Sequence, residues 1–389
     1  MSATPATRAT PTTPVTMTSP TAPISYSWEA TDEEVATRYG VPIDSIVRFD
    51  LNTSPTPPDL AARVLAAGRF VTPISEYPPS DYRRLVEAAA ARYGVARDEL
   101  LVGAGADEIL DLVGKAFLPA GSAAIVPTPT YAMFRVITEQ RGARTIAVPR
   151  IRDEGWRIDD VAILAAAPEA AVIWLCSPNN PTALAEPPGA IEGLLDALAS
   201  DAAPAGRRPP VVVLDEAYAE FVGRSLASLR AAYPRLVVVR TASKAYALAG
   251  LRVGFAIAVP ETIAEIAPYR PPGSVSTVSV TVVTAALRDD GALAGNLERV
   301  ERERERLADG LRSAGWDVGP SVTNFLLAGL GSASRAAAVA DGLLSRGLVP
   351  RTFGQGHPLS DHLRITVRDT AENDRLIDAA LEIAKEVRA

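Results

Sequence analysis

Short apolar runs alternate with helical segments from about residue 100 to residue 259. The runs are rich in β-branched residues and nearly continuous, as expected of strands that are covered on both faces. Helical segments such as residues 190–198 lie between them. The pattern predicts an α/β domain with a mostly parallel sheet, whose strands include residues 124–126, 145–148, 172–175, 211–214, 236–239 and 255–258.

A second region begins near the Pro-Pro-Gly sequence at residues 271–273. Interleaved charges across residues 299–307 indicate a helix with a solvated face. Short strands at residues 324–327 and 363–367 and a helix at 372–387 with one apolar stripe follow. This mixture favours a smaller α+β domain at the carboxyl end of the chain.

The first 25 residues are rich in Thr, Pro, Ala and Ser and lack the apolar segment of a signal peptide. We expect residues 1–25 to form a disordered tail, because this composition cannot bury a core.

The bulk composition is that of an ordinary soluble protein. The chain has 389 residues, 48% apolar and 22% charged, which is enough for a large core and two domains. Its net charge of −7 argues against nucleic acid or an anionic membrane as a partner. One cysteine fits a reducing cytoplasm, and two histidines leave little for a metal site. No apolar run approaches the roughly 20 residues of a membrane span.

Polar residues follow three of the predicted strands, at Ser177, Asp215 and Thr241. Ligands bind beyond the carboxyl ends of strands in such sheets. Lys244 comes just after the third strand, and its amine would be a good carbonyl nucleophile if burial or a nearby cation lowered its pKa. Thr241, Ser243 and Arg252 could hold a phosphate beside that amine. An aldehyde-bearing phosphate cofactor would suit this arrangement.

Other motifs fit the same site, although each has a plainer explanation. Asp215 could pair with a protonated ring nitrogen, or could cap the next helix. The Ser-Pro-Asn-Asn-Pro-Thr turn at residues 177–182 could aim an amide into a cleft, or could be only a turn. Tyr131 could stack on a flat ring or pack in the core. Arg364 could bind a substrate carboxylate or form an internal ion pair.

The Gly-Ala-Gly sequence at residues 103–105 precedes Ala106 and Asp107 and a helical run. Small residues at a helix start let backbone N–H groups approach an anion, although a simple loop explains them equally well. The six-position dinucleotide fingerprint is absent, because no third glycine follows at the required place.

Together these segments resemble the fold-type I pyridoxal-phosphate-dependent aminotransferases, and most closely the histidinol-phosphate aminotransferase family. The resemblance runs from about Phe49 to the carboxyl terminus, and the lysine segment and the 177–182 turn carry it most strongly. It implies a large domain at residues 49–270 with a mostly parallel seven-stranded sheet and a small α+β domain at 271–389. It also implies that an arm at residues 26–48 packs with the small domain.

The resemblance assigns a role to each candidate residue. Lys244 would form the internal aldimine with pyridoxal phosphate, and Asp215 would pair with the pyridine nitrogen. Tyr131 would stack on the ring, and Asn180 and Tyr218 would contact its hydroxyl. The phosphate would be held by Ala106, Asp107, Thr241, Ser243 and Arg252, and by Tyr77 of a partner subunit. Asn52, Asn180 and Arg364 match positions that bind the substrate α-carboxylate, and Arg351 matches an arginine used on a distal phosphate.

By this resemblance the protein would be a cytoplasmic homodimer that transfers an amino group from histidinol phosphate to 2-oxoglutarate in histidine biosynthesis. Ala183 and Ala247 stand where the family commonly has glycine, and residues 271–276 lack its usual aromatic and asparagine. Aromatic or specialised amino acids therefore stay open as donors, as does a decarboxylase of the threonine-phosphate type. A non-enzymatic binding protein on the same scaffold is the remaining alternative, and the complete set of cofactor residues argues against it.

Overall fold

The computed structural model describes residues 24–202 and 208–386, so most of the predicted tail lies outside it. Within these residues, seven strands form one sheet in the order β2-β8-β7-β6-β5-β3-β4. Neighbours from β4 to β7 run parallel, whereas β8 is antiparallel to both β7 and β2. This confirms the expected mostly parallel sheet. The strands are β2 Leu100–Gly103, β3 Ala123–Thr128, β4 Arg144–Pro149, β5 Val172–Cys176, β6 Val211–Asp215, β7 Leu236–Thr241 and β8 Gly254–Ile257.

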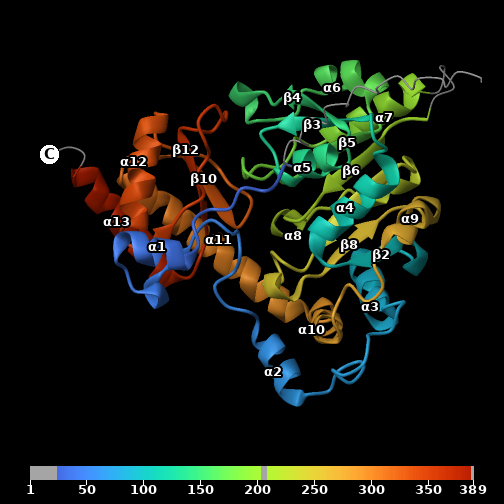
Figure 1. Cartoon of the computed structure of the whole chain (residues 1–389), viewed down its shortest axis with the longest axis horizontal. Helices are drawn as coiled ribbons and strands as arrows, with labels where there is room; N and C mark the ends of the chain where they lie inside the picture. The colour runs from blue at the N-terminus through green and yellow to red at the C-terminus, as the bar shows by residue number, and fades with distance from the viewer. Residues whose placement is uncertain (1–23, 203–207, 387–389) are drawn as a thin grey trace, which may run out of the picture.

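Helices cover both faces of this sheet (Figure 1). Alternate residues of one strand enter different cores: Val212 and Leu214 pack in one, Val211 and Val213 in the other. The strands therefore need apolar side chains at every position, which explains their unbroken apolar runs. The helices of this lobe are α2 Asp59–Ala67, α3 Arg83–Tyr93, α4 Gly105–Phe117, α5 Met133–Gln140, α6 Asp160–Ala166, α7 Ala190–Ala202, α8 Ala219–Val222, α9 Pro260–Ile266 and α10 Thr277–Leu287.

A smaller lobe lies beside the first and has its own core (Figure 1). In the described part of this lobe, β9, β10 and β12 form an antiparallel sheet, and β1 pairs in parallel with β11. Its strands are β1 Val47–Arg48, β9 Asp317–Val318, β10 Phe325–Gly329, β11 Leu348–Val349 and β12 His362–Thr366, and its helices are α1 Asp32–Tyr39, α11 Asp290–Ser313, α12 Ala333–Leu344 and α13 Thr370–Glu386.

The two lobes share α11. Val280 and Val283 of α10 and Leu293 at the start of α11 pack into the core of the large sheet. Leu307 and Leu311, further along α11, pack into the core of the small lobe. We therefore propose that the domain boundary lies within α11 rather than at residue 271.

The amino-terminal arm is attached to the small lobe through α1 and β1. Tyr39 at the end of α1 donates its hydroxyl to Asp341 of α12 at 2.5 Å, and β1 pairs with β11. Thr31 and Glu34 form a capping box that fixes the start of α1. The arm therefore enters the small lobe before the chain reaches the large sheet. Among the described residues, no helix is long and apolar enough to cross a membrane.

Ala247 occupies a left-handed backbone conformation, with φ of 55°. A side chain at such a position costs about 1–2 kcal/mol, and glycine avoids that cost. We expect Ala247→Gly to raise the free energy of unfolding by about 1 kcal/mol, measured by denaturant titration. Ala249→Gly is the matched control, because Ala249 begins a 3-10 turn without a positive φ. Equal effects of the two substitutions would show that strain at Ala247 is not the cause.

Candidate functional site

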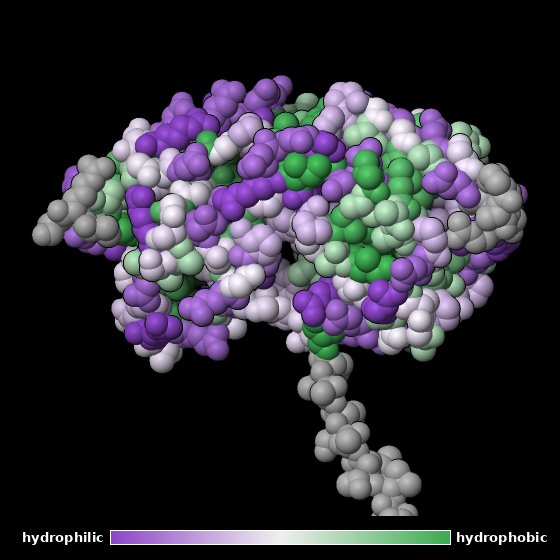
Figure 2. All heavy atoms as spheres, turned by 90° about the horizontal axis from the view of Figure 1, so that it is seen from above, coloured by the Kyte–Doolittle hydropathy of each residue, from purple (hydrophilic) through white to green (hydrophobic). Residues whose placement is uncertain are grey.

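Most of the predicted site residues lie at one edge of the large sheet. Asp215 at the end of β6 lies opposite Cys176 at the end of β5, and Thr241 at the end of β7 lies opposite Gly254. The loops that follow β5, β6 and β7 therefore leave the sheet side by side. The surface is hollowed between the two lobes when the molecule is seen from above (Figure 2).

Hydroxyls, a helix start and a guanidinium meet at this edge. Thr241 Oγ1 donates to Ser243 Oγ at 2.9 Å and accepts the Ser243 backbone N–H at 3.1 Å. α4 begins at Gly105, which has φ of 85°, and a Cβ added there would clash with Arg252 Nη2. Only glycine lets the arginine approach this close. The combination is suited to a phosphate.

Ala106 and Asp107 form the first turn of α4, where backbone N–H groups have no partner within the helix. The Asp107 carboxylate accepts from Arg252 Nη2 at 3.2 Å and from the Tyr131 hydroxyl at 2.7 Å. Burial raises the pKa of the Tyr131 phenol, so it stays neutral and able to donate. The structure thus joins the predicted anion cradle to the predicted stacking tyrosine.

Lys244 directs its amine toward the start of the large domain. Nζ donates to the backbone oxygens of Asn52 at 3.1 Å and Leu51 at 3.3 Å and lies 6.0 Å from the centre of the Tyr218 ring. Burial, with the cation of Arg364, lowers the pKa of this amine to about 8. About a tenth of the population is therefore a neutral nucleophile at pH 7, far more than for an ordinary lysine.

Asp215 is a buried carboxylate with one backbone partner. Its Oδ1 accepts the Ala217 N–H at 3.0 Å, so the residue does shape the turn after β6. Burial raises the pKa of the carboxyl to about 7. A cationic N–H group placed beside it would restore the charged form. The next helix, α8, has Tyr218 as its N-cap without a side-chain hydrogen bond, so Asp215 stabilises the turn but does not cap that helix.

Arg364 forms a second binding corner. Its Nη1 donates to Asn180 Oδ1 at 2.6 Å, its Nη2 donates to the backbone oxygen of Asp50, and its guanidinium lies 5.5 Å from the centre of the Phe325 ring. Nε is buried without a partner among the described residues. Burial lowers the pKa of this arginine, which an arriving anion would counteract. No acidic side chain pairs with it in the described chain, which argues against the internal ion pair.

Asn52 and Tyr218 connect this corner to the lysine. Asn52 Nδ2 donates to the Tyr218 hydroxyl at 3.0 Å, and burial raises the pKa of that hydroxyl. The Tyr218 ring packs edge-on against Phe325. The neighbouring Asn179, by contrast, bonds to Pro129 and Thr182 and stabilises the turn itself.

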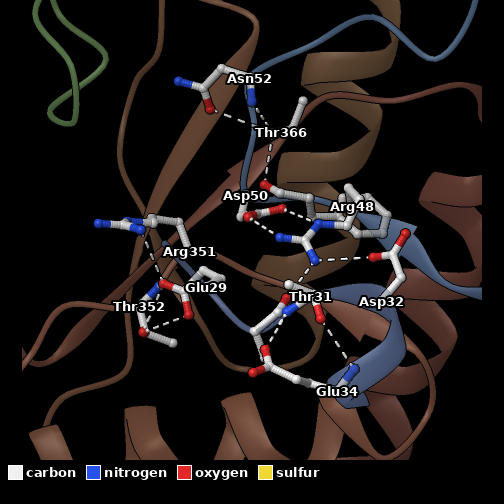
Figure 3. Close-up of polar contacts among 12 residues, drawn as sticks. Glu29, Thr31, Asp32, Glu34, Arg48, Asp50, Asn52, Arg351, Thr352 and Thr366 are labelled. Carbon is white, nitrogen blue, oxygen red and sulfur yellow. Dashed lines mark hydrogen bonds and ion pairs between the residues drawn. The ribbon is translucent and has the colours of Figure 1, made fainter. Parts of the chain in front are cut away.

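Arg351 lies beside Arg364 but is held by the amino-terminal arm. The two arginines exchange backbone hydrogen bonds at 3.0 Å each, so they stand directly opposite one another on adjacent segments. Arg351 Nη1 lies 3.5 Å from the carboxylate of Glu29, which also accepts from Thr352 (Figure 3). The residue predicted for a distal phosphate therefore already has an acidic neighbour.

Tyr77 is the one predicted residue that this chain does not bring into the cluster. Its side chain is 87% exposed and lies next to Gly273. The described residues also contain no group of three or more acidic, histidine or cysteine side chains placed to hold a metal.

Sequence reasoning missed four contributors to the site. Phe325 supports both Tyr218 and Arg364, and Asn324 donates to the Asn52 backbone oxygen at 3.0 Å. Both lie at the start of a strand that was predicted, but only the folded chain shows which face they occupy. Asp50 and Glu29 act on arginines distant in sequence, and no local motif signals such contacts.

Comparison with known proteins gives a consistent result. The sequence profile of aminotransferase class I and II matches residues 49–379. The chain is 36% identical over 359 residues to a histidinol-phosphate aminotransferase of Roseiflexus castenholzii, covering 90% of this chain and 93% of that protein. It is 34% identical over 340 residues to one of Thermococcus gammatolerans, covering 87% and 92%. The crystal structure of histidinol-phosphate aminotransferase from Sinorhizobium meliloti with pyridoxal 5'-phosphate superposes with a TM-score of 0.82 at 27% identity, covering 93% and 96% of the two chains.

The burial of Asp215 predicts an unusual dependence of stability on pH. Its pKa in the folded protein, about 7, lies above the ordinary 3.8. Below about pH 4 the carboxyl is neutral in both the folded and the unfolded protein, so its burial costs no charge penalty. As the pH rises through 7, this penalty develops in full and the protein loses the corresponding stability. We expect Asp215→Asn, in protein stripped of small molecules, to raise the free energy of unfolding at pH 8 by roughly 2–4 kcal/mol.

Denaturant titrations between pH 5 and pH 8 measure this effect, and the advantage of the variant should grow with pH and level off above 7. Asp98→Asn is the matched control, because Asp98 is exposed, and we expect it to stay within about 0.5 kcal/mol of the native protein. A difference that does not change with pH would contradict the assignment.

Proposed function

The chain belongs to the aminotransferase class I and II family, and on that premise we propose that it transfers the amino group of histidinol phosphate to 2-oxoglutarate, in histidine biosynthesis. Its match to this family and its similarity to histidinol-phosphate aminotransferases support a pyridoxal-phosphate-dependent transaminase. The observation that carries the choice of donor is the pair of adjacent arginines, Arg351 and Arg364, at the small-lobe side of the site. The one cysteine, Cys176, is a buried free thiol, and we place the enzyme in the reducing cytoplasm.

The residues present fit pyridoxal phosphate. The cradle at Thr241, Ser243 and Arg252 has the donors that a phosphate needs, and a Cβ at Gly105 would push the Arg252 guanidinium out of its present position. Among the described residues no cation forms an ion pair with the buried Asp215, and a protonated ring nitrogen would supply one. Lys244 offers an amine whose pKa is already lowered to about 8.

When bound, the cofactor supplies an aldehyde that condenses with amines and a ring that accepts electrons from the adjoining carbon. Asp215 would hold the ring nitrogen of the cofactor and keep it protonated. Lys244 would act as the base that takes the proton from the donor's Cα and, once protonated, as the acid that gives it back. Its pKa near 8 suits both steps, because neither protonation state is strongly disfavoured at neutral pH.

Arg364 and Asn180 bind the anionic end of the substrate. A carboxylate, such as the α-carboxylate of glutamate, needs one guanidinium fork. Histidinol phosphate has no carboxylate, and its anionic group is a larger phosphate dianion. The adjacent Arg351 gives that dianion a second cation, which supports a donor bearing phosphate.

We expect a donor panel of histidinol phosphate, phenylalanine, tyrosine and O-phosphothreonine, with 2-oxoglutarate as acceptor, to show the highest kcat/KM for histidinol phosphate. Arg351→Gln should raise the KM for that donor about 10- to 100-fold, because a charge-assisted contact is lost. Its effect on phenylalanine should stay within about threefold. Preference for an unphosphorylated donor would instead favour an aromatic or specialised aminotransferase. Release of carbon dioxide from O-phosphothreonine would favour a decarboxylase.

We also propose a homodimer with shared active sites. Tyr77 is 87% exposed and the nearby Ile74 is 70% exposed, which leaves this segment uncovered in a single chain. A partner subunit would bury it and would place Tyr77 beside the partner's phosphate cradle.

Mixed dimers test this arrangement. Lys244→Ala should abolish transamination, and Tyr77→Ala should lower activity at limiting cofactor. Refolding the two variants together in equal amounts should restore activity to about a quarter of the native level, because half of the dimers carry one complete site. A chain with both substitutions, mixed with Lys244→Ala, is the control and should stay inactive. Failure of the first mixture to regain activity, with dimers present, would contradict the shared site.

A further inference from the structure

The segment at residues 24–31 crosses from the large lobe to the small one. Gln140 Nε2 at the end of α5 donates to the backbone oxygen of Ile24 at 2.8 Å. Arg48 Nη1 in β1 donates to the backbone oxygen of Ala30 at 2.6 Å. Between these two anchors the segment contacts Arg351, so it forms part of the wall beside the substrate site.

Glu29 is fixed within this segment by contacts that do not involve Arg351. Its carboxylate accepts the Thr352 backbone N–H at 2.8 Å and the Thr352 hydroxyl at 2.9 Å (Figure 3). These bonds place a negative charge 3.5 Å from Arg351 Nη1, and both side chains are only 16% exposed. The charge is therefore screened less than it would be at an open surface.

Arg351 is engaged by the arm from several directions. Its guanidinium lies 5.3 Å from the centre of the Tyr26 ring, and its Nη1 donates to the Ser27 backbone oxygen at 2.8 Å. On the other side stands Arg364, and two like charges directly opposite one another are unfavourable without an anion. Glu29 supplies that anion from within the chain.

We propose that Glu29 is a specificity-determining residue that competes with the donor's phosphate for Arg351. This inference rests on the proposed function, in which Arg351 binds that phosphate. A phosphate that binds Arg351 must either displace the Glu29 carboxylate or bind next to this like charge. Both outcomes cost binding free energy. A donor without phosphate does not meet this cost. Glu29 therefore lowers the ratio of kcat/KM for phosphorylated donors to kcat/KM for unphosphorylated donors.

Glu29→Gln is the sharpest test, because the amide oxygen can still accept from Thr352 while the charge is removed. The KM for histidinol phosphate should fall about fivefold, the value expected for a partly exposed ion pair, with kcat unchanged within about twofold. The KM for histidinol, which lacks the phosphate, should not change. Glu33→Gln is the matched control. Glu33 is exposed on α1, so its substitution removes the same charge at a position away from Arg351.

A binding measurement separates this inference from the proposed reaction. Trp28, one of four tryptophans, is 72% exposed and its ring packs edge-on against Tyr26, 4.8 Å away, so part of the protein's fluorescence comes from the arm. Titrating the holoenzyme with imidazolylpropyl phosphate, which has no amine to transfer, should give a dissociation constant about fivefold lower in Glu29→Gln than in the native protein. Imidazolylpropanol should bind both equally.

An unchanged or weaker affinity for the phosphate compound in Glu29→Gln would overturn the inference, as would an equal gain in Glu33→Gln. If the native enzyme does not transaminate histidinol phosphate, the proposed donor is wrong. The titration with the amine-free phosphate still decides whether Glu29 opposes anions at Arg351.

Discussion

Arg364 joins three parts of the chain that lie far apart in sequence. From β12 of the small lobe, it donates to Asn180 in the turn after β5 and to the backbone of Asp50 in the segment that leaves β1. Phe325 of β10 supports the guanidinium from the side. A buried arginine is costly unless each of these partners is in place. The position of the small lobe against the sheet edge therefore depends on the same side chain that we propose binds substrate.

At the edge of the large sheet, two ionisable side chains, Lys244 and Asp215, are buried where burial disfavours their charged forms. Burial lowers the pKa of Lys244 to about 8 and raises that of Asp215 to about 7, so both are brought toward neutrality. A protein selected only for stability would pair these groups fully or replace them. Their retention at adjacent strand ends is the arrangement expected of reactive groups that await a third, complementary one.

The sequence predicted the parts of this structure that depend on local pattern. The strand runs were recognisable because both faces of the sheet are covered. Asp215 was recognisable because it directly follows the run at 211–214, and Lys244 because it lies in the loop shortly after the run at 236–239. The resemblance implied a small domain from residue 271 onward, but α10 packs in the core of the large sheet. A run such as Thr-Val-Ser-Val-Thr-Val-Val does not reveal which core it joins. Phe325 and Glu29 could not be found in advance, since their contacts with Arg364 and Arg351 join residues brought together only by tertiary packing. The roles assigned to the site residues stay predictions, although the structure places all but Tyr77 either at one edge of the large sheet or in the corner that Arg364 forms.

In our proposal, residues at the sheet edge carry the reaction chemistry, and residues 24–31 of the arm adjust substrate choice. This division has a physical reason. Residues at the ends of parallel strands are held by ladders of backbone hydrogen bonds and by cores on both faces, so their geometry changes little with the identity of nearby side chains. The segment at residues 24–31 is held by a few individual bonds, such as that between Gln140 and Ile24. A substitution there alters one contact to the substrate pocket without disturbing the sheet. The reaction chemistry can thus stay fixed at Lys244 and Asp215, while a residue such as Glu29 adjusts which substrates reach it.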